Sequence, residues 1–272
     1  MVVLVATLKN ECVPDLVKQM NLTATDTIVV NQWGTERSLT ERTSSGRMTV
    51  LESNRIGLSA SRNDAISLAK TDDICQLADD DMVFVDDYDD IVAEAYQKIP
   101  EADIIVFYIE YELSSLSKKK LPAKKLNYLS AMKVSSCQIT FKKSKIEEKE
   151  LRFDERFGIG AKYTFGEENI FLFDALRSGL SVYSYPVKIA RLRHRESYWD
   201  RTPNKTLSRK RGAVYKRMSP VWYWVLILQF AVRKRKLVKP HLSMLEDIKY
   251  MFQGAREFQA SSKISDKTNQ KK

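Results

Sequence analysis

Residues 57–84 read GLSASRNDAISLAKTDDICQLADDDMVF, and this stretch decides the fold class. Its first half, at 58–70, has the apolar spacing that predicts a helix, and the apolar run at 74–77 predicts a buried strand. A helix followed by a strand is the unit from which parallel sheets are built. Ligands bind to such sheets beyond the carboxyl ends of the strands, and three aspartates, at 79–81, follow this strand.

The same alternation extends to both sides of this stretch. Further strands are predicted at 2–7, 27–31, 48–51 and 104–108, and further helices at 13–20 and 89–98. This alternation predicts an α/β fold with a mostly parallel central sheet. After a lysine-rich segment, LSSLSKKKLPAKKLNYLS, which is typical of a solvated loop or lid, a strand is predicted at 138–141, a helix at 170–180 and a strand at 182–185.

The charge of the chain is divided unevenly. Its formal net charge is +10, but residues 201–272 hold 18 Lys and Arg against 4 Asp and Glu, whereas residues 1–200 are slightly acidic. Such a basic tail usually contacts a polyanion, either nucleic acid or an anionic membrane. The three widely spaced cysteines suit a reducing compartment, and the N-terminal apolar run, which follows no basic segment, is interpreted as a strand rather than a signal peptide.

The acidic triplet is a candidate metal site. Three adjacent carboxylates repel one another, which costs stability unless a cation or solvent relieves the repulsion. Mg²⁺ and Mn²⁺ prefer oxygen ligands and usually share their coordination shell with substrate phosphates. Asp79, Asp80 and Asp81 therefore suit a divalent metal that also binds a diphosphate. Taken alone, the triplet also fits an acidic, solvated turn.

Downstream features place the triplet in a wider pattern. Residues 153–176 read FDERFGIGAKYTFGEENIFLFDAL, and His194 follows. With the Arg-Asn pair at 62–63, the Asp-x-Asp and the Gly-Glu-Glu, where many members have Gly-Glu-Asp, the chain resembles the family 2 glycosyltransferases. The resemblance covers about residues 1–197 and is strongest to members that build bacterial surface and capsular polysaccharides. The order and spacing of the four elements carry it.

This resemblance implies a GT-A fold, which is Rossmann-like and has helices on both faces of the central sheet. We expect a catalytic domain at 1–200, with a nucleotide-sugar-binding half at 1–110 and an acceptor half at 131–197. A basic helical extension is expected at 201–260 and a disordered tail at 261–272.

The resemblance also implies roles for individual residues. The family's Asp-x-Asp, here Asp79 and Asp81, binds the donor's ribose and the Mn²⁺ or Mg²⁺ that bridges its diphosphate, with Asp81 as the more direct ligand. His194 corresponds to a histidine that completes the metal shell in some members, and a structural or solvated histidine is the alternative. The general base is expected at Glu168, with Glu167 either as the base or as a ligand of an acceptor hydroxyl.

Donor contacts are expected at the ends of the first two strands and around the triplet, at Ala6, Thr7, Asn31, Arg62, Asn63, Asp79 and Asp80. Arg62 either contacts the diphosphate or pairs with a buried acidic neighbour. Sugar transfer needs a neutralised diphosphate leaving group and a carboxylate on the opposite side of the anomeric carbon. One carboxylate cluster and one distant carboxylate are what a single-displacement, inverting reaction requires, and no residue stands out as the acid that glycoside hydrolysis needs.

The basic tail contains an apolar run at 221–232 with basic clusters on both sides. At about 1.5 Å per residue, about 12 residues span about 18 Å, which is too short for a hydrocarbon core of about 30 Å. Trp222, Tyr223 and Trp224 are of the types enriched at membrane interfaces, and Arg233 and Lys234 suit anionic headgroups. The tail therefore predicts an anchor in the membrane plane, and a buried C-terminal helix is the alternative. No nucleic-acid module is recognisable.

The sequence thus predicts an inverting transferase that moves a sugar from a nucleotide-sugar donor to a hydroxyl of an acceptor. The expected donor is a UDP-sugar. A polyprenyl-diphosphate-linked saccharide is the expected acceptor, and the expected location is cytoplasmic, peripheral on the inner face of the cell membrane. The alternatives are a nucleotidyltransferase of similar fold, which would not require the Gly-Glu-Glu, and a non-catalytic protein that binds a membrane or nucleic acid.

Overall fold

The structure is a computed structural model that describes residues 1–36, 41–45, 47–112, 120–193 and 202–269. The chain forms two compact units. The first, the sheet unit, comprises residues 1–161 and 167–196, and the second, the helical unit, comprises residues 162–166 and 197–272.

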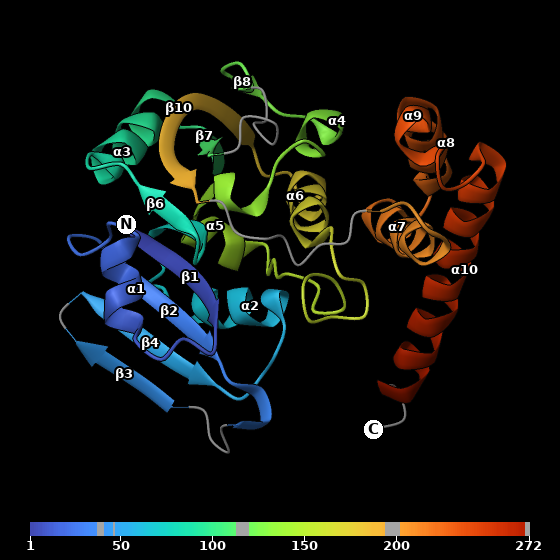
Figure 1. The fold of residues 1–272 in the computed structure, drawn as a ribbon. Coiled ribbons are helices and arrows are strands. Elements are labelled where there is room, and N and C mark those ends of the chain that lie inside the picture. Colours follow the sequence, from blue (N-terminus) through green and yellow to red (C-terminus); the bar gives the residue numbers. More distant parts are fainter. Residues whose placement is uncertain (37–40, 46, 113–119, 194–201, 270–272) are drawn as a thin grey trace. The chain divides into compact units, whose positions relative to one another are not determined.

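The described part of the sheet unit contains one ten-stranded sheet of order β3-β4-β2-β1-β5-β9-β7-β10-β6, with β8 paired to β10 (Figure 1). The strands are β1 (Val2–Leu8), β2 (Asp26–Gln32), β3 (Glu41–Ser45), β4 (Met48–Ser53), β5 (Ile74–Asp79), β6 (Met82–Phe84), β7 (Ile104–Tyr111), β8 (Lys124–Lys125), β9 (Ile139–Lys142) and β10 (Val182–Leu192). The neighbours β4, β2, β1 and β5 are parallel, as are β7 and β10, while β9 runs antiparallel to both β5 and β7. The predicted α/β class and its parallel core are confirmed.

The register of the parallel strands places the candidate site at one edge of the sheet. Thr7 of β1 is opposite Asn31 of β2, and Ala6 is opposite Asp79 of β5. The carboxyl ends of these three strands therefore meet, as the position of the triplet after its strand predicts.

Helices cover both faces of the sheet (Figure 1). They are α1 (Val13–Gln19), α2 (Leu58–Leu68), α3 (Tyr88–Lys98), α4 (Tyr128–Ala131), α5 (Lys143–Glu148) and α6 (Glu167–Arg177). Val3 and Val5 of β1 belong to the core that α1 and α3 cover, whereas Val2 and Leu4 belong to the core that α2, α5 and α6 cover. Central strands that are buried on both faces are apolar at every position, which explains the continuous apolar runs of the sequence.

Two elements differ from their predicted bounds in ways that affect the site. Helix α6 begins at Glu167, three residues before the apolar spacing that predicts it, because acidic residues are favourable in the first turn of a helix. Strand β10 continues past Pro186 to Leu192, since its pairing with β7 is irregular between Ser184 and Lys188 and accommodates the proline.

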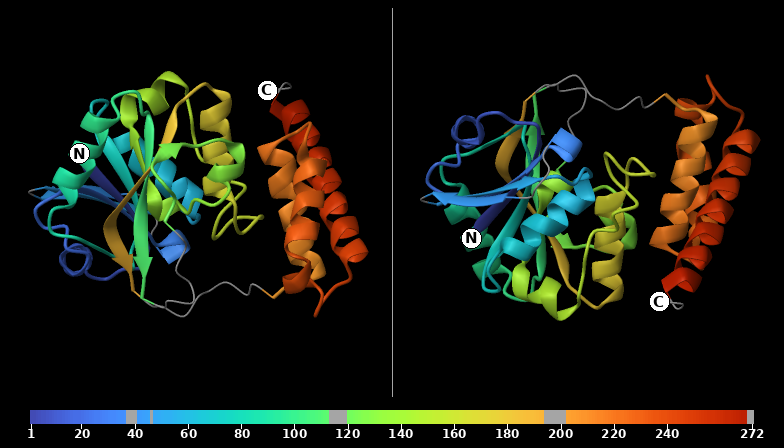
Figure 2. Two further views of the ribbon diagram at one scale, coloured as in Figure 1. Left: turned by 90° about the horizontal axis from the view of Figure 1, so that it is seen from above. Right: turned by 90° about the horizontal axis from the view of Figure 1, so that it is seen from below.

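The helical unit consists of α7 (Lys205–Met218), α8 (Tyr223–Arg233), α9 (Arg235–Val238) and α10 (Met244–Asn269), together with the segment 162–166. In both views of Figure 2, α7 and α10 lie side by side. Their backbones touch at two glycines: a Cβ on Gly212 would lie 1.8 Å from the Met251 carbonyl oxygen, and a Cβ on Gly254 would lie 1.9 Å from that of Arg209. Only glycine fits at these two crossings.

Helix α10 extends to Asn269, into the segment 261–272 for which the sequence predicts disorder. Once a helix has formed, each added residue gains a backbone hydrogen bond without a new nucleation cost, so polar residues can continue it. Residues 270–272 lie outside the described part of the chain.

None of the described helices is long and apolar enough to cross a membrane.

Candidate active site

The acidic triplet ends β5 and turns the chain toward β6. Asp79 is the last residue of the strand, and Asp80 and Asp81 form the turn. The Thr7 hydroxyl, at the end of β1, donates a hydrogen bond of 2.7 Å to Asp80 Oδ2. The predicted donor residues Ala6, Thr7, Asp79 and Asp80 therefore lie together at the carboxyl ends of β1 and β5.

Arg62 occupies the centre of the candidate site. Its side chain is 2% exposed and projects from the first half of α2. The guanidinium carbon lies over the Phe153 ring, 5.5 Å from the ring centroid. Arg62 Nη2 donates to Asp79 Oδ1 at 3.1 Å, and Nη1 donates to Glu167 Oε1 at 3.0 Å. Of the two roles expected for Arg62, the structure shows the pairing with acidic neighbours.

The electrostatic balance keeps Arg62 charged although it is buried. Burial lowers the pKa of the Arg62 guanidinium, but the carboxylates of Asp79, Glu167 and Glu168 raise it more, so the net shift is upward. A buried cation needs such partners because an unpaired buried charge is strongly unfavourable. The ion pairs with Asp79 and Glu167 therefore explain how a charged arginine can be buried at this position.

The two glutamates of the Gly-Glu-Glu form the first turn of α6. Glu167 is buried, and its Oε2 atom has no hydrogen-bond partner among the described residues. Glu168 is half-buried. A buried carboxylate oxygen without a protein partner is rare in folded proteins and suits a ligand's hydroxyl group. The structure thus separates the pair: Glu167 is held by Arg62, and Glu168 is nearer to solvent.

The glycine-rich loop at 157–160 lies against the start of α2 and against Glu167. The Leu58 amide donates to the Ile159 carbonyl at 2.9 Å, and the Ser59 hydroxyl donates to that of Phe157 at 2.6 Å. Gly158 has a φ of +102°, and a Cβ there would lie 3.3 Å from the Glu167 carboxyl carbon. Glycine at this position allows the loop to approach the glutamate closely.

The side-chain amides of Asn31 and Asn63, both predicted to bind the sugar donor, form hydrogen bonds with other residues of the protein. Asn31 Nδ2 donates to the Asn10 carbonyl at 2.8 Å and to Glu52, and Asn31 Oδ1 accepts from the Asn10 amide. Asn63 exchanges two hydrogen bonds with the backbone of Phe153, each of 2.9 Å. These contacts order the loops around the site, and direct donor contacts by Asn31 and Asn63 stay predictions.

Glu52 lies at the edge of the candidate site, although it is not among the residues predicted from the sequence. It lies opposite Asn31 near the end of β4 and accepts hydrogen bonds from Asn31 and Trp33. The signal that identifies the aspartate triplet, an acidic residue directly after an apolar strand at 48–51, also identifies Glu52.

A divalent metal fits the residues present at the triplet only in part. The donors are carboxylates, which Mg²⁺ and Mn²⁺ prefer, and Asp79 Oδ2 accepts no hydrogen bond from the described residues. However, no group of three or more His, Cys, Asp and Glu side chains converges within the described ranges. His194 lies outside them, although the amide of the preceding residue, Arg193, donates to the Asp81 carbonyl at 2.9 Å.

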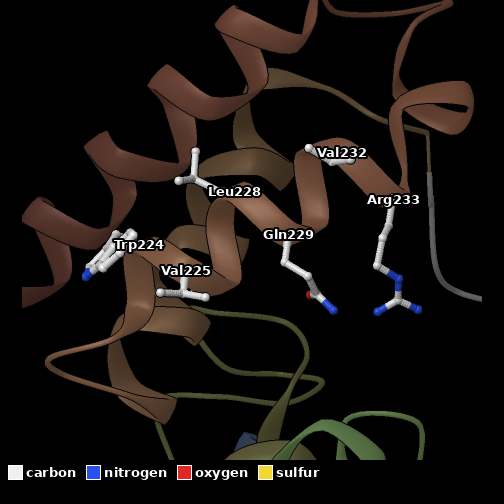
Figure 3. A pocket seen from close by; sticks show the side chains of 6 residues that line it. All are labelled: Trp224, Val225, Leu228, Gln229, Val232 and Arg233. Atoms are coloured by element: carbon white, nitrogen blue, oxygen red, sulfur yellow. The ribbon is translucent and has the colours of Figure 1, made fainter.

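The residues predicted to contact a membrane lie at the start and end of α8. Leu226, Ile227 and Ala231 are buried within the helical unit, but the rest of the apolar run is largely exposed, with Trp222 at 61% and Val232 at 69%. Figure 3 shows Trp224, Val225, Leu228 and Val232 on this helix beside Gln229 and Arg233, which line a shallow apolar groove. The exposed apolar residues of this region, on α8 and just before it, are here called the α8 face. They are Val221, Trp222, Trp224, Val225, Leu228 and Val232.

No protein-family model matches the sequence, and a comparison with curated proteins finds no match. Among solved structures, residues 1–349 of Staphylococcus aureus TarS in complex with UDP-GlcNAc match with a TM-score of 0.61 at 12% identity, over 89% of this chain and 74% of that one. The same TarS residues in a second structure match with a TM-score of 0.58 at 10% identity, over 96% and 92% of the two chains. A longer TarS structure matches with a TM-score of 0.55 over 79% of this chain and 38% of that one. The chain has the GT-A fold of these glycosyltransferases, and the fold predicted from the resemblance is confirmed.

Proposed function

We propose that this protein is a nucleotide-sugar-dependent glycosyltransferase that transfers a sugar from a UDP-sugar to an acceptor hydroxyl with inversion at the anomeric carbon. One observation carries the proposal: at the carboxyl end of a GT-A sheet, buried Arg62 joins Asp79 of β5 to Glu167 of α6. A donor-side carboxylate and an acceptor-side carboxylate are thereby fixed in one site. The complex of TarS with UDP-GlcNAc supports UDP as the nucleotide.

The donor side is assigned to the strand ends. Ala6 and Thr7 border the nucleotide, and Asp79 and Asp81 would hold Mn²⁺ or Mg²⁺, with His194 as a further proposed ligand. When bound, such an ion neutralises the charge that develops on the diphosphate leaving group. Thr7 keeps Asp80 oriented through its 2.7 Å hydrogen bond.

The acceptor side is assigned to the first turn of α6. Glu168 takes the proton of the acceptor hydroxyl while that oxygen forms a bond to the anomeric carbon and the bond to the diphosphate oxygen breaks. Glu167 is not assigned as the base, because its carboxylate is buried and paired with Arg62, whereas Glu168 is nearer to solvent. The Oε2 atom of Glu167 is assigned to accept a hydrogen bond from an acceptor hydroxyl.

A lipid-linked acceptor is proposed because of the α8 face. An exposed apolar surface of this kind marks an interaction site, and its occupant is taken to be an anionic bilayer because Arg233, Lys234, Arg235 and Lys236 follow it directly. The helix would lie in the interface with its tryptophans among the headgroups. The proposed location is therefore the inner face of the cell membrane, and the proposed acceptor is a polyprenyl-diphosphate-linked saccharide.

The experiment that tests the activity measures UDP release from a panel of UDP-sugars and other nucleotide sugars, with Mn²⁺, with Mg²⁺ and with a chelator. Metal-dependent UDP release that an acceptor accelerates supports a glycosyltransferase. Release of pyrophosphate from a nucleoside triphosphate and a sugar phosphate would instead identify a nucleotidyltransferase. No turnover of any donor, with intact folding, would leave only a binding function.

A further inference from the structure

Five residues just before the catalytic glutamates belong to the helical unit. The segment 162–166 packs on α7 and α10, whereas residue 161 before it and Glu167 after it belong to the sheet unit. The segment 162–166, KYTFG, continues the glycine-rich loop at 157–160 in sequence, but it packs in the helical unit.

Each of four consecutive residues in this segment has its own contact in the helical unit. The buried ring of Tyr163 packs edge-on against Phe258 of α10, with centroids 5.7 Å apart. The Thr164 hydroxyl accepts a hydrogen bond of 3.3 Å from Lys210, and Arg211 lies 5.8 Å from the Phe165 ring.

The fourth contact is a close approach of backbone to side chain. Gly166 has a φ of +91°, and a Cβ there would lie 2.7 Å from Val214 Cγ1 of α7. A larger residue would clash, so the segment can follow α7 closely only with glycine here. Glu167, the first residue of α6, follows Gly166 directly in the chain.

Arg211 connects this segment to α8. Its guanidinium lies 4.0 Å from the Phe230 ring centroid on α8 and 5.8 Å from the Phe165 ring. Burial lowers the pKa of Arg211 despite opposing effects of Tyr215 and Asp247. A planar guanidinium suits such a site because it stacks on aromatic rings and is weakly hydrated.

We propose that Arg211 is a positioning residue for the acceptor side: by holding the segment 162–166 on α7 and α8, it fixes the first turn of α6 and therefore Glu168. The effect reaches Glu168 through the chain itself, because only Glu167 separates it from the segment. Donor binding at the ends of β1 and β5 does not depend on this contact. The kinetic part of this inference rests on the proposed function, whereas the structural part does not.

The structural part is tested by amide hydrogen exchange in the full-length protein. Arg211→Ala and, from the side of the segment, Phe165→Leu should speed exchange in peptides covering 162–168 by about 3- to 30-fold, the factor expected for losing a desolvated cation–π contact. Arg209→Ala is the matched control, since Arg209 lies on the same helix but its guanidinium contacts α10, at the Tyr250 ring (5.6 Å) and at Gln253. Unchanged exchange in both variants, or an equal increase in the control, overturns the proposal.

The kinetic part separates positioning from simple destabilisation. Arg211→Ala should lower kcat with saturating acceptor by about 10- to 100-fold, because small displacements of a reacting group cost that much, while the Kd for UDP stays within about two-fold of wild type. Arg211→Lys, which keeps a cation beside the rings, should recover part of the loss. Equal losses in UDP binding and turnover contradict a positioning role. If the wild type itself turns over no nucleotide sugar, the proposed function fails, and the exchange experiment still decides whether Arg211 holds the segment.

Discussion

Arg62 donates a hydrogen bond of 3.0 Å to Glu167 across 105 residues of sequence, and both side chains are buried. The contact joins α2, which precedes the acidic triplet, to α6, which begins at Glu167. The other terminal nitrogen of the same guanidinium donates to Asp79, so a change in the position or charge of one carboxylate affects the other. Asp79, Arg62 and Glu167 therefore form one electrostatic unit.

Replacing Arg62 with methionine should destabilise the fold. The change leaves Glu167 buried without its counter-ion, which typically costs about 3–5 kcal/mol in the free energy of unfolding. Urea denaturation of Arg62→Met measures the loss. The double variant Arg62→Met/Glu167→Gln should recover much of it, since no buried charge then lacks a partner. A double variant no more stable than Arg62→Met would contradict the ion-pair interpretation.

Asp81→Asn should reduce turnover by about 100-fold or more while the protein stays folded, because a lost metal ligand removes several kcal/mol of leaving-group stabilisation. Initial rates over a series of Mn²⁺ concentrations, with circular dichroism to check folding, measure this. Asp86→Asn, at an exposed aspartate bound by Asn21, is the control and should behave as wild type. Wild-type rate and metal dependence in Asp81→Asn would exclude Asp81 as a metal ligand.

The two glutamates should differ in kind. Glu168→Gln should lower turnover by about 100-fold or more with little change in donor affinity, as expected for loss of a general base. Glu167→Gln should chiefly lower stability, since it weakens the pair with Arg62. Steady-state kinetics and thermal unfolding of both variants distinguish the roles. If Glu167→Gln shows the kinetic effect instead, the base moves by one residue; if neither variant is slow, the acceptor-side assignment is wrong.

The α8 face should bind vesicles in proportion to their content of phosphatidylglycerol, and salt should weaken this binding without removing it. Each basic residue near an anionic surface contributes about 1 kcal/mol, which ions screen, whereas the buried aromatic area is insensitive to salt. Trp222→Ser/Trp224→Ser should shift the protein to the supernatant in co-sedimentation. Arg233→Gln/Lys234→Gln should instead reduce only the salt-sensitive part. A wild-type protein that stays in the supernatant with every lipid mixture would rule out the membrane as the partner.

Gly212→Ala should destabilise the helical unit. Alanine is normally the better residue in a helix, by about 1 kcal/mol, so the expected sign is opposite to propensity. The added Cβ would overlap the Met251 carbonyl, and overpacking typically costs about 1–3 kcal/mol or more. Thermal unfolding compares it with Thr206→Ala, an exposed position of the same helix. A Gly212→Ala protein that is as stable as wild type would contradict the close crossing of α7 and α10.

The sheet core could be predicted from the sequence because its strands are short, apolar on both faces and separated by turn-forming residues. The run at 74–77 became β5, and the triplet follows it at the carboxyl ends of the parallel strands, beside Thr7. The early start of α6 could not be predicted from apolar spacing, since Glu167 and Glu168 begin the helix without an apolar pattern. The short strands β3, β6 and β8 were also missed: β3 (ERTSS) and β8 (KK) have no apolar residue, and the apolar β6 (MVF) has only three residues, too few to show a pattern.

Contacts between residues far apart in the chain could not be predicted from the sequence, for a different reason. Arg62 could be expected to meet either a phosphate or a carboxylate, and its pairing with Glu167 depends on how α2 packs against α6. The membership of 162–166 in the helical unit has no sequence signal either, because the segment lies in the middle of the predicted acceptor half.

That membership has a consequence for how such chains can be recombined. A protein cut at residue 200, where the composition changes, would lose Phe258 and Arg211, which cover the rings of Tyr163 and Phe165. Newly exposed aromatic rings promote aggregation, so the shortened protein should be poorly soluble although its sheet is complete. Exchange of the helical unit with that of a structural relative should succeed only when KYTFG is exchanged along with it. The helical unit is therefore discontinuous in sequence: residues 162–166, from the middle of the chain, have to be exchanged together with residues 197–272.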